Sequence, residues 1–241
     1  MMRILIIGNK GSMGRRWTAC LKYLREDVLG FDIGGPVPTA PEFDRAIIAS
    51  PTDTHVMWAE YLINAGKDFI CEKPVDKDPA VIRRLADKAK FAGVDGRMCC
   101  NWLFAVNQAL LLGRGPDGRQ GATANMGEME IEYKYYNSGK DGFFWDCIQL
   151  IYLSGKFKYD RTSPMFEAFV NGDPVTLEMV ERSYLIMLSE WMYGDRNRLW
   201  SLEDAAKASE KVMGAIAHNT GEVVGEASFF PPGLAPWVVA G

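Results

Sequence analysis

Five short apolar runs, most of them followed by a stretch with helical spacing, occupy the first hundred residues and constrain the fold most. The runs cover residues 2–7, 28–32, 45–49, 69–71 and 97–101. Short, nearly continuous apolar runs are typical of strands that a parallel sheet buries on both faces. Helices are expected over residues 15–25, 52–65 and 78–92. Strands that alternate with helices at this spacing predict an α/β fold, with a doubly wound parallel sheet of the Rossmann type.

The pattern changes after residue 105, which predicts two domains. A Rossmann domain is expected over residues 1–105, and a smaller, reduced α+β domain over residues 106–241. Residues 129–135 alternate with period two, as a half-buried antiparallel strand does. The other elements expected here are a strand over residues 165–170 and helices over residues 104–112, 143–153, 177–193 and 202–218. Ser201 is the expected N-cap of the last helix.

The composition of the chain excludes several classes of function. The 241 residues carry a net charge of −4 without a basic block, so nucleic acid is not an expected partner. The apolar runs are shorter than the roughly 18–20 residues that cross a membrane. A strand that begins by Arg3 leaves no room for a signal peptide. Five cysteines without metal-type spacing and two histidines predict a cytoplasmic protein with reduced thiols and no metal site.

Three glycines follow the first apolar run, at positions 8, 11 and 14. A glycine turn between a strand and a helix is typical of a dinucleotide site, because glycine lets the backbone approach a pyrophosphate closely. The helix N-terminus adds N–H groups and the positive end of a dipole. The spacing is G-x-x-G-x-x-G rather than G-x-G-x-x-G, and an ordinary structural turn is the alternative. The cofactor-binding residues expected in this turn are Gly8, Lys10, Gly11, Ser12 and Met13.

Asp32 closes the second apolar run and is the expected partner of the adenosine ribose. It lies 24 residues after Gly8, close to the roughly 20 residues at which an acid meets these hydroxyl groups. No arginine stands beside it to receive a 2′-phosphate, and a carboxylate would repel that group. NAD is therefore the expected cofactor, with NADP less favoured. The alternative is an ordinary solvated aspartate at a strand end.

Glu72, Lys73 and Pro74 follow the fourth apolar run. In an open parallel sheet, ligands bind outside the carboxyl ends of the strands, so Lys73 is well placed to meet a substrate. A partly desolvated lysine can have its pKa lowered and can exchange a proton with a substrate oxygen. The alternative is a surface lysine that pairs with Glu72.

With these features in place, the first 105 residues resemble the family of glucose–fructose oxidoreductase, inositol dehydrogenase and the rhizopine-catabolism dehydrogenases (Gfo/Idh/MocA). Residues 11–16, Gly-Ser-Met-Gly-Arg-Arg, are similar to the family's G-S-I-G-R-R. Residues 50–55 are similar to its [ST]-P-x-x-x-H, and residues 65–74 to its A-G-K-x-V-x-x-E-K-P. Residues 101–104, Asn-Trp-Leu-Phe, are similar to its N-Y-R-F.

The resemblance implies roles for individual residues. Lys73 would lie beside the nicotinamide as a catalytic residue, and Glu72 near the nicotinamide ribose. The residues that would line the nicotinamide half of the cofactor are Ser50, Pro51, Thr52 and His55. A histidine at a helix start is also often a cap or a packing residue, and that alternative stays open for His55.

The second half departs from the family. Members are usually longer and carry a D-x-x-x-H type motif, whose histidine is the second acid/base. The nearest counterpart here has Asp146 but no histidine, and Gln149 can hydrogen-bond a sugar hydroxyl without taking up a proton. Asp146 is the second expected catalytic residue, with a helix-start residue as the alternative. Asn101 and Gln149 are the expected substrate contacts. The family's histidine in the glycine-helix motif is Trp17 here.

Two functions follow from these features. The first is an NAD-dependent oxidoreductase that transfers hydride between nicotinamide and a hydroxyl or keto carbon of a sugar-like or polyol substrate. The second is a nucleotide-binding sensor or scaffold without redox turnover, which the missing histidine suggests. The substrate is a small molecule, and homo-oligomers are one expectation: the apolar tail and the region of Trp191 and Trp200 would either join copies of the chain or be buried within it.

Overall fold

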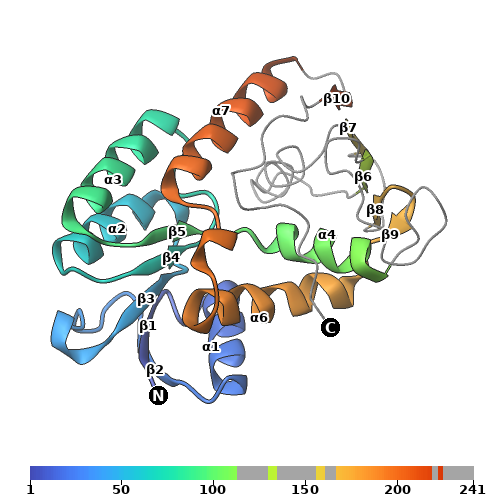
Figure 1. Ribbon diagram of the computed structural model, residues 1–241. Helices are drawn as coiled ribbons and strands as arrows, with labels where there is room; N and C mark the ends of the chain where they lie inside the picture. The colour runs from blue at the N-terminus through green and yellow to red at the C-terminus, as the bar shows by residue number, and fades with distance from the viewer. Residues whose placement is uncertain (113–129, 135–155, 161–166, 219–221, 225–241) are drawn as a thin grey trace. The chain divides into compact units, whose positions relative to one another are not determined.

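The computed structural model describes residues 1–112, 130–134, 156–160, 167–218 and 222–224 (Figure 1). The chain divides into two compact units. The first unit comprises Met1–Cys99 and Leu188–Ser209, and the second unit comprises Cys100–Met187 and Glu210–Gly241.

The first unit contains a sheet of five parallel strands in the order β2-β1-β3-β4-β5. The strands are β1 (Arg3–Ile7), β2 (Asp27–Phe31), β3 (Arg45–Ile48), β4 (Phe69–Cys71) and β5 (Gly96–Met98). The apolar side chains of β1, β3 and β4 are almost completely buried, which explains why these runs are apolar at nearly every position. The predicted doubly wound parallel sheet is confirmed.

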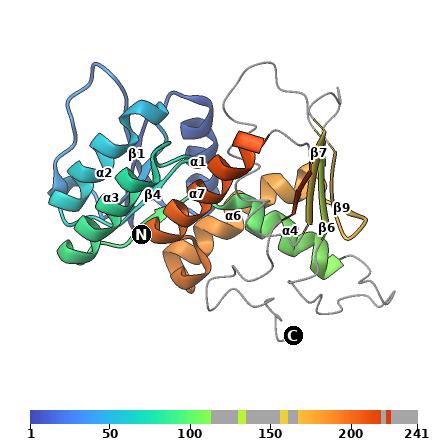
Figure 2. The same ribbon diagram turned by 90° about the horizontal axis from the view of Figure 1, so that it is seen from above.

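The helices of the first unit cover both faces of this sheet. Figures 1 and 2 show α1 (Ser12–Tyr23) on one face and α2 (His55–Asn64) with α3 (Pro79–Ala92) on the other. The ends of α3 follow local rules, since the Asp78 side chain accepts a hydrogen bond from the N–H of Ala80 and Gly93 ends the helix at φ 67°. Between β2 and β3 the chain forms only a loop and the short 3-10 helix η1 (Ala40–Glu42).

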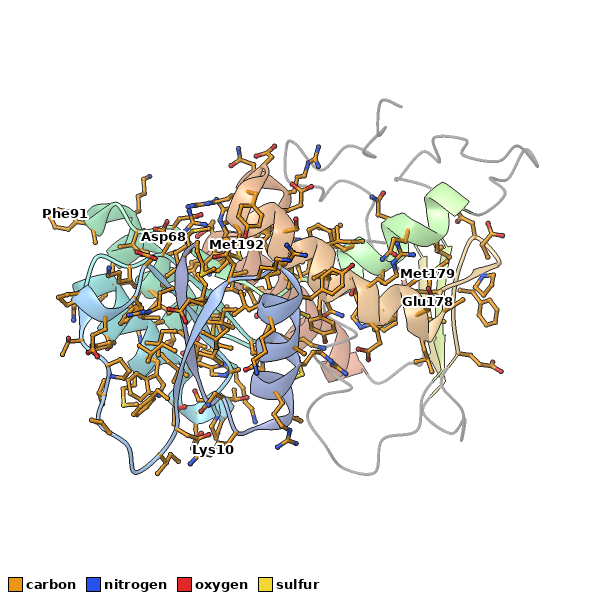
Figure 3. All side chains as sticks on the ribbon, turned by 90° about the horizontal axis from the view of Figure 1, so that it is seen from below. Lys10, Asp68, Phe91, Glu178, Met179 and Met192 are labelled. Carbon is orange, nitrogen blue, oxygen red and sulfur yellow. The ribbon has the colours of Figure 1, made fainter. Side chains whose placement is uncertain are left out.

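The first unit also includes a segment that lies far along the sequence. It contains the end of α6 (Leu177–Tyr193), the 3-10 helix η4 (Arg196–Arg198) and the start of α7 (Leu202–His218). The N–H of Met98 donates to the carbonyl of Trp200 at 3.0 Å, so the segment continues the sheet beyond β5. The Arg196 guanidinium lies 2.8 Å from Asp68, which precedes β4. Figure 3 shows Asp68 at the opposite end of this unit from Lys10.

The indoles of Trp191 and Trp200 are completely buried within this unit. Arg45 stacks over the Trp191 ring at 5.4 Å and donates to the Trp191 carbonyl at 3.0 Å. These two tryptophans therefore pack within the chain, which was one of the two expectations for them.

The second unit contains a mixed five-stranded sheet in the order β10-β7-β6-β8-β9. Its strands are β6 (Glu130–Lys134), β7 (Lys156–Asp160), β8 (Glu167–Val170), β9 (Asp173–Pro174) and β10 (Glu222–Val224). β6 pairs antiparallel with β8, as predicted for its alternating sequence, and parallel with β7. The helix α4 (Asn101–Leu112) contacts β8 and β9. The helix expected over residues 143–153 lies outside the described residues.

Candidate functional site

The glycine turn after β1 is built on close backbone contacts. Gly8 has φ 87°, a left-handed conformation that favours glycine, and its N–H donates to the carbonyl of Phe31 at 2.8 Å. A Cβ atom on Gly8 would lie 2.6 Å from the carbonyl oxygen of Ala49. The turn therefore needs glycine at this position, both for its conformation and for its contact with the end of β3.

The third glycine of the turn lets α1 pack against it. A Cβ atom on Gly14 would lie 2.1 Å from the carbonyl oxygen of Gly8. Gly11 is the N-cap of α1, and no side chain among the described residues caps this helix. An uncapped helix N-terminus beside a glycine turn fits a pyrophosphate, which can accept hydrogen bonds from its N–H groups. Ser12 and Met13 form the first turn of this helix.

The Asp32 carboxylate is fixed by two backbone groups at the end of β2. Oδ2 accepts from the N–H of Lys10 at 2.9 Å, and Oδ1 accepts from the N–H of Ile33 at 2.8 Å. These hydrogen bonds, with that from Lys10 the larger effect, lower the pKa of Asp32. Asp32 lines a pocket of about 500 Å³ whose other lining residues are Asn9, Lys10, Leu29, Gly30, Phe31, Ile33, Gly34, Gly35, Pro36, Val37, Pro38 and Glu42. An ionised acid in an open pocket beside the glycine turn fits a ribose diol.

The residues that follow β3 form a second compact loop. Ser50 and Pro51 lead into the 3-10 helix η2 (Thr52–Thr54), and the Thr54 hydroxyl donates to Ser50 Oγ at 2.7 Å. His55 begins α2 and is 1% exposed. Its Nδ1 lies 2.6 Å from the carbonyl oxygen of Pro74, and its Nε2 lies 2.8 Å from the carbonyl oxygen of Ser50.

His55 therefore joins the loop after β3 to the loop after β4. Both ring nitrogens lie within hydrogen-bonding distance of backbone carbonyl oxygens, and the nitrogen that carries the N–H is the one that donates. This geometry supports a structural role for His55 as a packing residue, because its two ring nitrogens contact the loop after β3 and the loop after β4.

Glu72 and Lys73 follow β4 directly. Glu72 is 6% exposed, and its Oε1 accepts a hydrogen bond from Trp17 Nε1 at 2.8 Å. Its Oε2 lies 3.3 Å from the backbone N–H of Lys73. The Lys73 side chain is half-buried, and the Lys73–Pro74 peptide bond is cis. The Trp17–Glu72 bond was not expected from the sequence, although the replacement of the family's histidine by Trp17 pointed to this position.

The sheet brings most of the expected site residues to one edge. Strands β2, β1, β3 and β4 are neighbours and parallel, so the residues just after them share the carboxyl edge. These residues include Asp32, Gly8, Ser50 and Lys73. Ligands of open parallel sheets bind at this edge, at the point where the strand order reverses.

The expected residues of the second half are described only in part. Asn101 begins α4, is 1% exposed, and its Nδ2 lies 3.5 Å from the Ser183 hydroxyl within the second unit. Asp146 and Gln149 lie outside the described residues. In the described part of the chain, no group of three or more His, Cys, Asp or Glu side chains could hold a metal ion. Nor does that part contain a helix long and apolar enough to cross a bilayer.

Comparison with known proteins bears on this site. Residues 36–96 match the Gfo/Idh/MocA family model, described as an oxidoreductase family with an NAD-binding Rossmann fold. A segment of 47 residues is 40% identical to inositol 2-dehydrogenase of Rhizobium meliloti; it covers 20% of this chain and spans only 14% of that relative's length.

Two solved structures share the fold over most of the chain. The WlbA dehydrogenase of Thermus thermophilus, solved with NAD and α-ketoglutarate, has a TM-score of 0.60 and 14% identity, covering 87% of this chain and 93% of its own. An oxidoreductase of Agrobacterium radiobacter, solved with NAD⁺, L-tartaric acid and magnesium, has a TM-score of 0.63 and 12% identity. The match covers 92% of this chain and 98% of the Agrobacterium chain.

Proposed function

We propose that this protein, whose residues 36–96 match the Gfo/Idh/MocA oxidoreductase family model, is an NAD-dependent dehydrogenase acting on a hydroxyl or keto carbon of a sugar-like or polyol substrate. One observation carries the proposal. A glycine turn, an ionised acid and a lysine lie on the carboxyl edge of one parallel sheet, after β1, β2 and β4. These are the groups that bind a dinucleotide and move a proton beside it.

The first unit supplies the groups for cofactor binding. The N-terminus of α1 and the backbone of the glycine turn receive the pyrophosphate. Asp32 accepts hydrogen bonds from the adenosine ribose, and its charge opposes a 2′-phosphate. Lys10 belongs to the glycine turn and its backbone N–H donates to Asp32, so it connects the pyrophosphate site with the ribose site. NAD is therefore the preferred cofactor, and when bound it supplies the hydride acceptor.

Lys73 supplies the proton chemistry. An alcohol carbon that gives up hydride must also lose the proton of its oxygen, and the Lys73 amine takes that proton. In the reverse direction Lys73 donates it to the carbonyl oxygen. The loop that carries Lys73 is held by Glu72 on one side and by the contact between His55 and Pro74 on the other. Asp146 is proposed to orient Lys73, and Asn101 and Gln149 to contact the substrate.

The substrate class is supported by the named relatives. Inositol 2-dehydrogenase is named for a polyol, and the matched segment of 47 residues supports the same class of substrate here. The Agrobacterium oxidoreductase was solved with L-tartaric acid, which also carries vicinal hydroxyl groups.

A direct test has two steps. The purified protein is titrated with NADH and NADPH, and it is then screened with polyols and keto-sugars for a change in nicotinamide absorbance. We expect tight NADH binding, weak NADPH binding and turnover of at least one substrate. Lys73→Ala should abolish turnover and leave NADH affinity nearly unchanged, whereas Lys77→Ala, at an exposed lysine in the same loop, should retain activity.

Two results would contradict the proposal. Retained turnover in Lys73→Ala would remove the lysine from the mechanism. Binding of NADH without turnover of any substrate would instead favour a nucleotide-binding sensor or scaffold.

A further inference from the structure

Trp17 is completely buried in α1, and its indole N–H makes a polar contact that crosses the site. Its indole N–H donates to Glu72 Oε1 at 2.8 Å, between residues 55 positions apart in the sequence. An indole can only donate a hydrogen bond, and an ionised carboxylate can only accept, so the direction of this bond is fixed. Bonds to ionised groups are stronger than neutral ones, and more so in a buried setting.

The bond links the two ends of the proposed cofactor site. Trp17 lies on the helix whose N-terminus begins at the glycine turn, and Glu72 immediately precedes Lys73. The second oxygen of Glu72 lies 3.3 Å from the N–H of Lys73. A carboxylate offers about four acceptor positions. The two N–H groups therefore leave acceptor capacity on Glu72 for a hydroxyl group of a ligand.

The strand order indicates which ligand group reaches Glu72. Asp32 follows β2 and Glu72 follows β4, and β1 and β3 lie between these strands. Three strand spacings separate the two acids by roughly 14 Å along the carboxyl edge. The glycine turn follows β1, within that interval. A dinucleotide with its first ribose at Asp32 and its pyrophosphate at the turn would thus extend its second ribose toward Glu72.

We propose that Trp17 is a positioning residue, which holds the Glu72 carboxylate so that it accepts the hydroxyl groups of the second ribose. The inference rests on the proposed function, since it concerns the same dinucleotide site. Without the indole N–H, Glu72 loses a charge-assisted bond in a buried setting and its carboxylate can turn away from the ligand. The indole N–H of Trp17 thus fixes the Glu72 carboxylate, in the same way as the backbone N–H of Lys10 fixes the Asp32 carboxylate at the first ribose site.

The test compares ligands of increasing length by isothermal titration calorimetry. ADP carries the first ribose and the pyrophosphate, ADP-ribose adds the second ribose, and NADH adds the nicotinamide. Trp17→Phe keeps an aromatic ring and removes the N–H. We expect it to weaken ADP-ribose and NADH about tenfold, the effect of losing one charge-assisted hydrogen bond, and to leave ADP affinity unchanged.

Glu72→Gln provides a second variant that keeps the packing, because its amide oxygen can still accept the indole N–H. We expect the same pattern over the three ligands. The double variant, Trp17→Phe with Glu72→Gln, should bind ADP-ribose as tightly as whichever single variant has the lower affinity. The reason is that both substitutions act on the same contact between Glu72 and the second ribose. In the protein without ligand, Glu72→Gln should also shift the NMR resonance of the Trp17 indole N–H, identified by its loss in Trp17→Phe.

Trp191→Phe is the matched control. Trp191 is also completely buried in the first unit, and its indole N–H has no hydrogen-bond partner in the described part of the chain. This variant should bind ADP, ADP-ribose and NADH as the wild type does, even if its stability falls.

The outcomes separate this inference from the proposed function. If the wild type binds neither ADP nor NADH, the proposed function fails and the inference fails with it. If the wild type binds all three ligands but Trp17→Phe leaves ADP-ribose affinity unchanged, only the inference is overturned. Equal weakening of all three ligands also overturns it, since Trp17 would then support α1 as a whole. Should Trp17→Phe not fold, unchanged ADP-ribose affinity in Glu72→Gln would overturn it as well.

Discussion

Replacing Gly14 by alanine sets two effects of known size against each other. Gly14 lies in the first turn of α1, where helix propensity favours alanine by up to about 1 kcal/mol. A Cβ atom would, however, lie 2.1 Å from the Gly8 carbonyl oxygen, 2.6 Å from Asn9 Cα and 2.8 Å from the Gly8 carbonyl carbon. All three are backbone atoms, so no side chain can move aside to relieve the contact.

The contact outweighs the propensity. An ordinary contact begins at 3.4 Å, so the Gly8 oxygen would have to move by about 1.3 Å. Inserting atoms into close-packed structure costs about 1–3 kcal/mol, with the upper end expected where backbone must shift. After the gain in propensity, we expect Gly14→Ala to lower the free energy of unfolding by about 2 kcal/mol. For a chain of this size that corresponds to a fall in Tm of about 4–8 °C.

Urea unfolding followed by circular dichroism measures this loss, and calorimetric titration with NADH measures the distortion of the turn. We expect NADH affinity to fall by more than about tenfold, because Gly8 is the residue displaced. Gly35→Ala is the control for stability, since the nearest atom to its Cβ would be the Asp32 carbonyl oxygen at an ordinary 3.5 Å. A Gly14→Ala protein with wild-type stability and wild-type NADH affinity would refute the reasoning.

Three further perturbations test other parts of the first unit. His55→Asn cannot reach both carbonyl groups that the ring contacts, and should lower the free energy of unfolding by about 2 kcal/mol in urea; a loss below about 0.5 kcal/mol would remove its role as a link. The pKa of Asp32 is lowered in the folded protein, so its contribution to stability is present above its unfolded value of 3.8 and is lost as pH falls below it. The Tm difference between wild type and Asp32→Asn should therefore stay constant above about pH 5 and shrink in acid; a constant difference at all pH values would contradict this. Arg196→Ala breaks two half-buried ion pairs and should lower the free energy of unfolding by about 1 kcal/mol. Arg182→Ala breaks an exposed ion pair and should lower it by less than about 0.5 kcal/mol. Equal losses in the two variants would show that burial of the ion pair does not decide the difference.

The elements and turns with local signals could be predicted from the sequence. The buried strands of the first unit read as short apolar runs, and the long helices α6 and α7 agree with the predicted residues 177–193 and 202–218. Ser201 caps α7 as expected, since its hydroxyl accepts a hydrogen bond from the N–H of Asp204 at 3.2 Å. The same hydroxyl also donates to the Asp204 carboxylate at 2.6 Å. Helix α1 begins at Ser12, three residues earlier than predicted, because Gly11 already acts as its N-cap.

The contacts that hold the site together could not be predicted, because their partners are far apart in the sequence. Nothing near Trp17 indicates that its N–H meets Glu72, and nothing near His55 indicates the carbonyl of Pro74. The strands β7, β9 and β10 are not predicted either. β7 does alternate with period two, but β9 has only two residues and β10 only three, too few for a pattern.

The expected roles of the site residues stay predictions. The glycine turn, the Asp32 carboxylate and Lys73 have geometry that fits a dinucleotide, but which side chains touch a substrate depends on the second half of the chain. Asp146 and Gln149, the residues most specific to that half, lie outside the described part. The family's motifs end near residue 105, so neither spacing nor resemblance fixes the substrate contacts.

The continuation of the sheet beyond β5 affects how this protein is made. The chain from Leu188 to Ser209 belongs to the first unit, and the N–H of Met98 finds its acceptor only at Trp200. While the ribosome is still translating the intervening residues, β5 has an unpaired edge, and such an edge can pair with other chains. At about 5–20 residues per second, the hundred residues between them take roughly 5–20 s to synthesise. The first unit can therefore complete its structure only after most of the chain has been synthesised, and a fragment ending near residue 105 would retain that exposed edge.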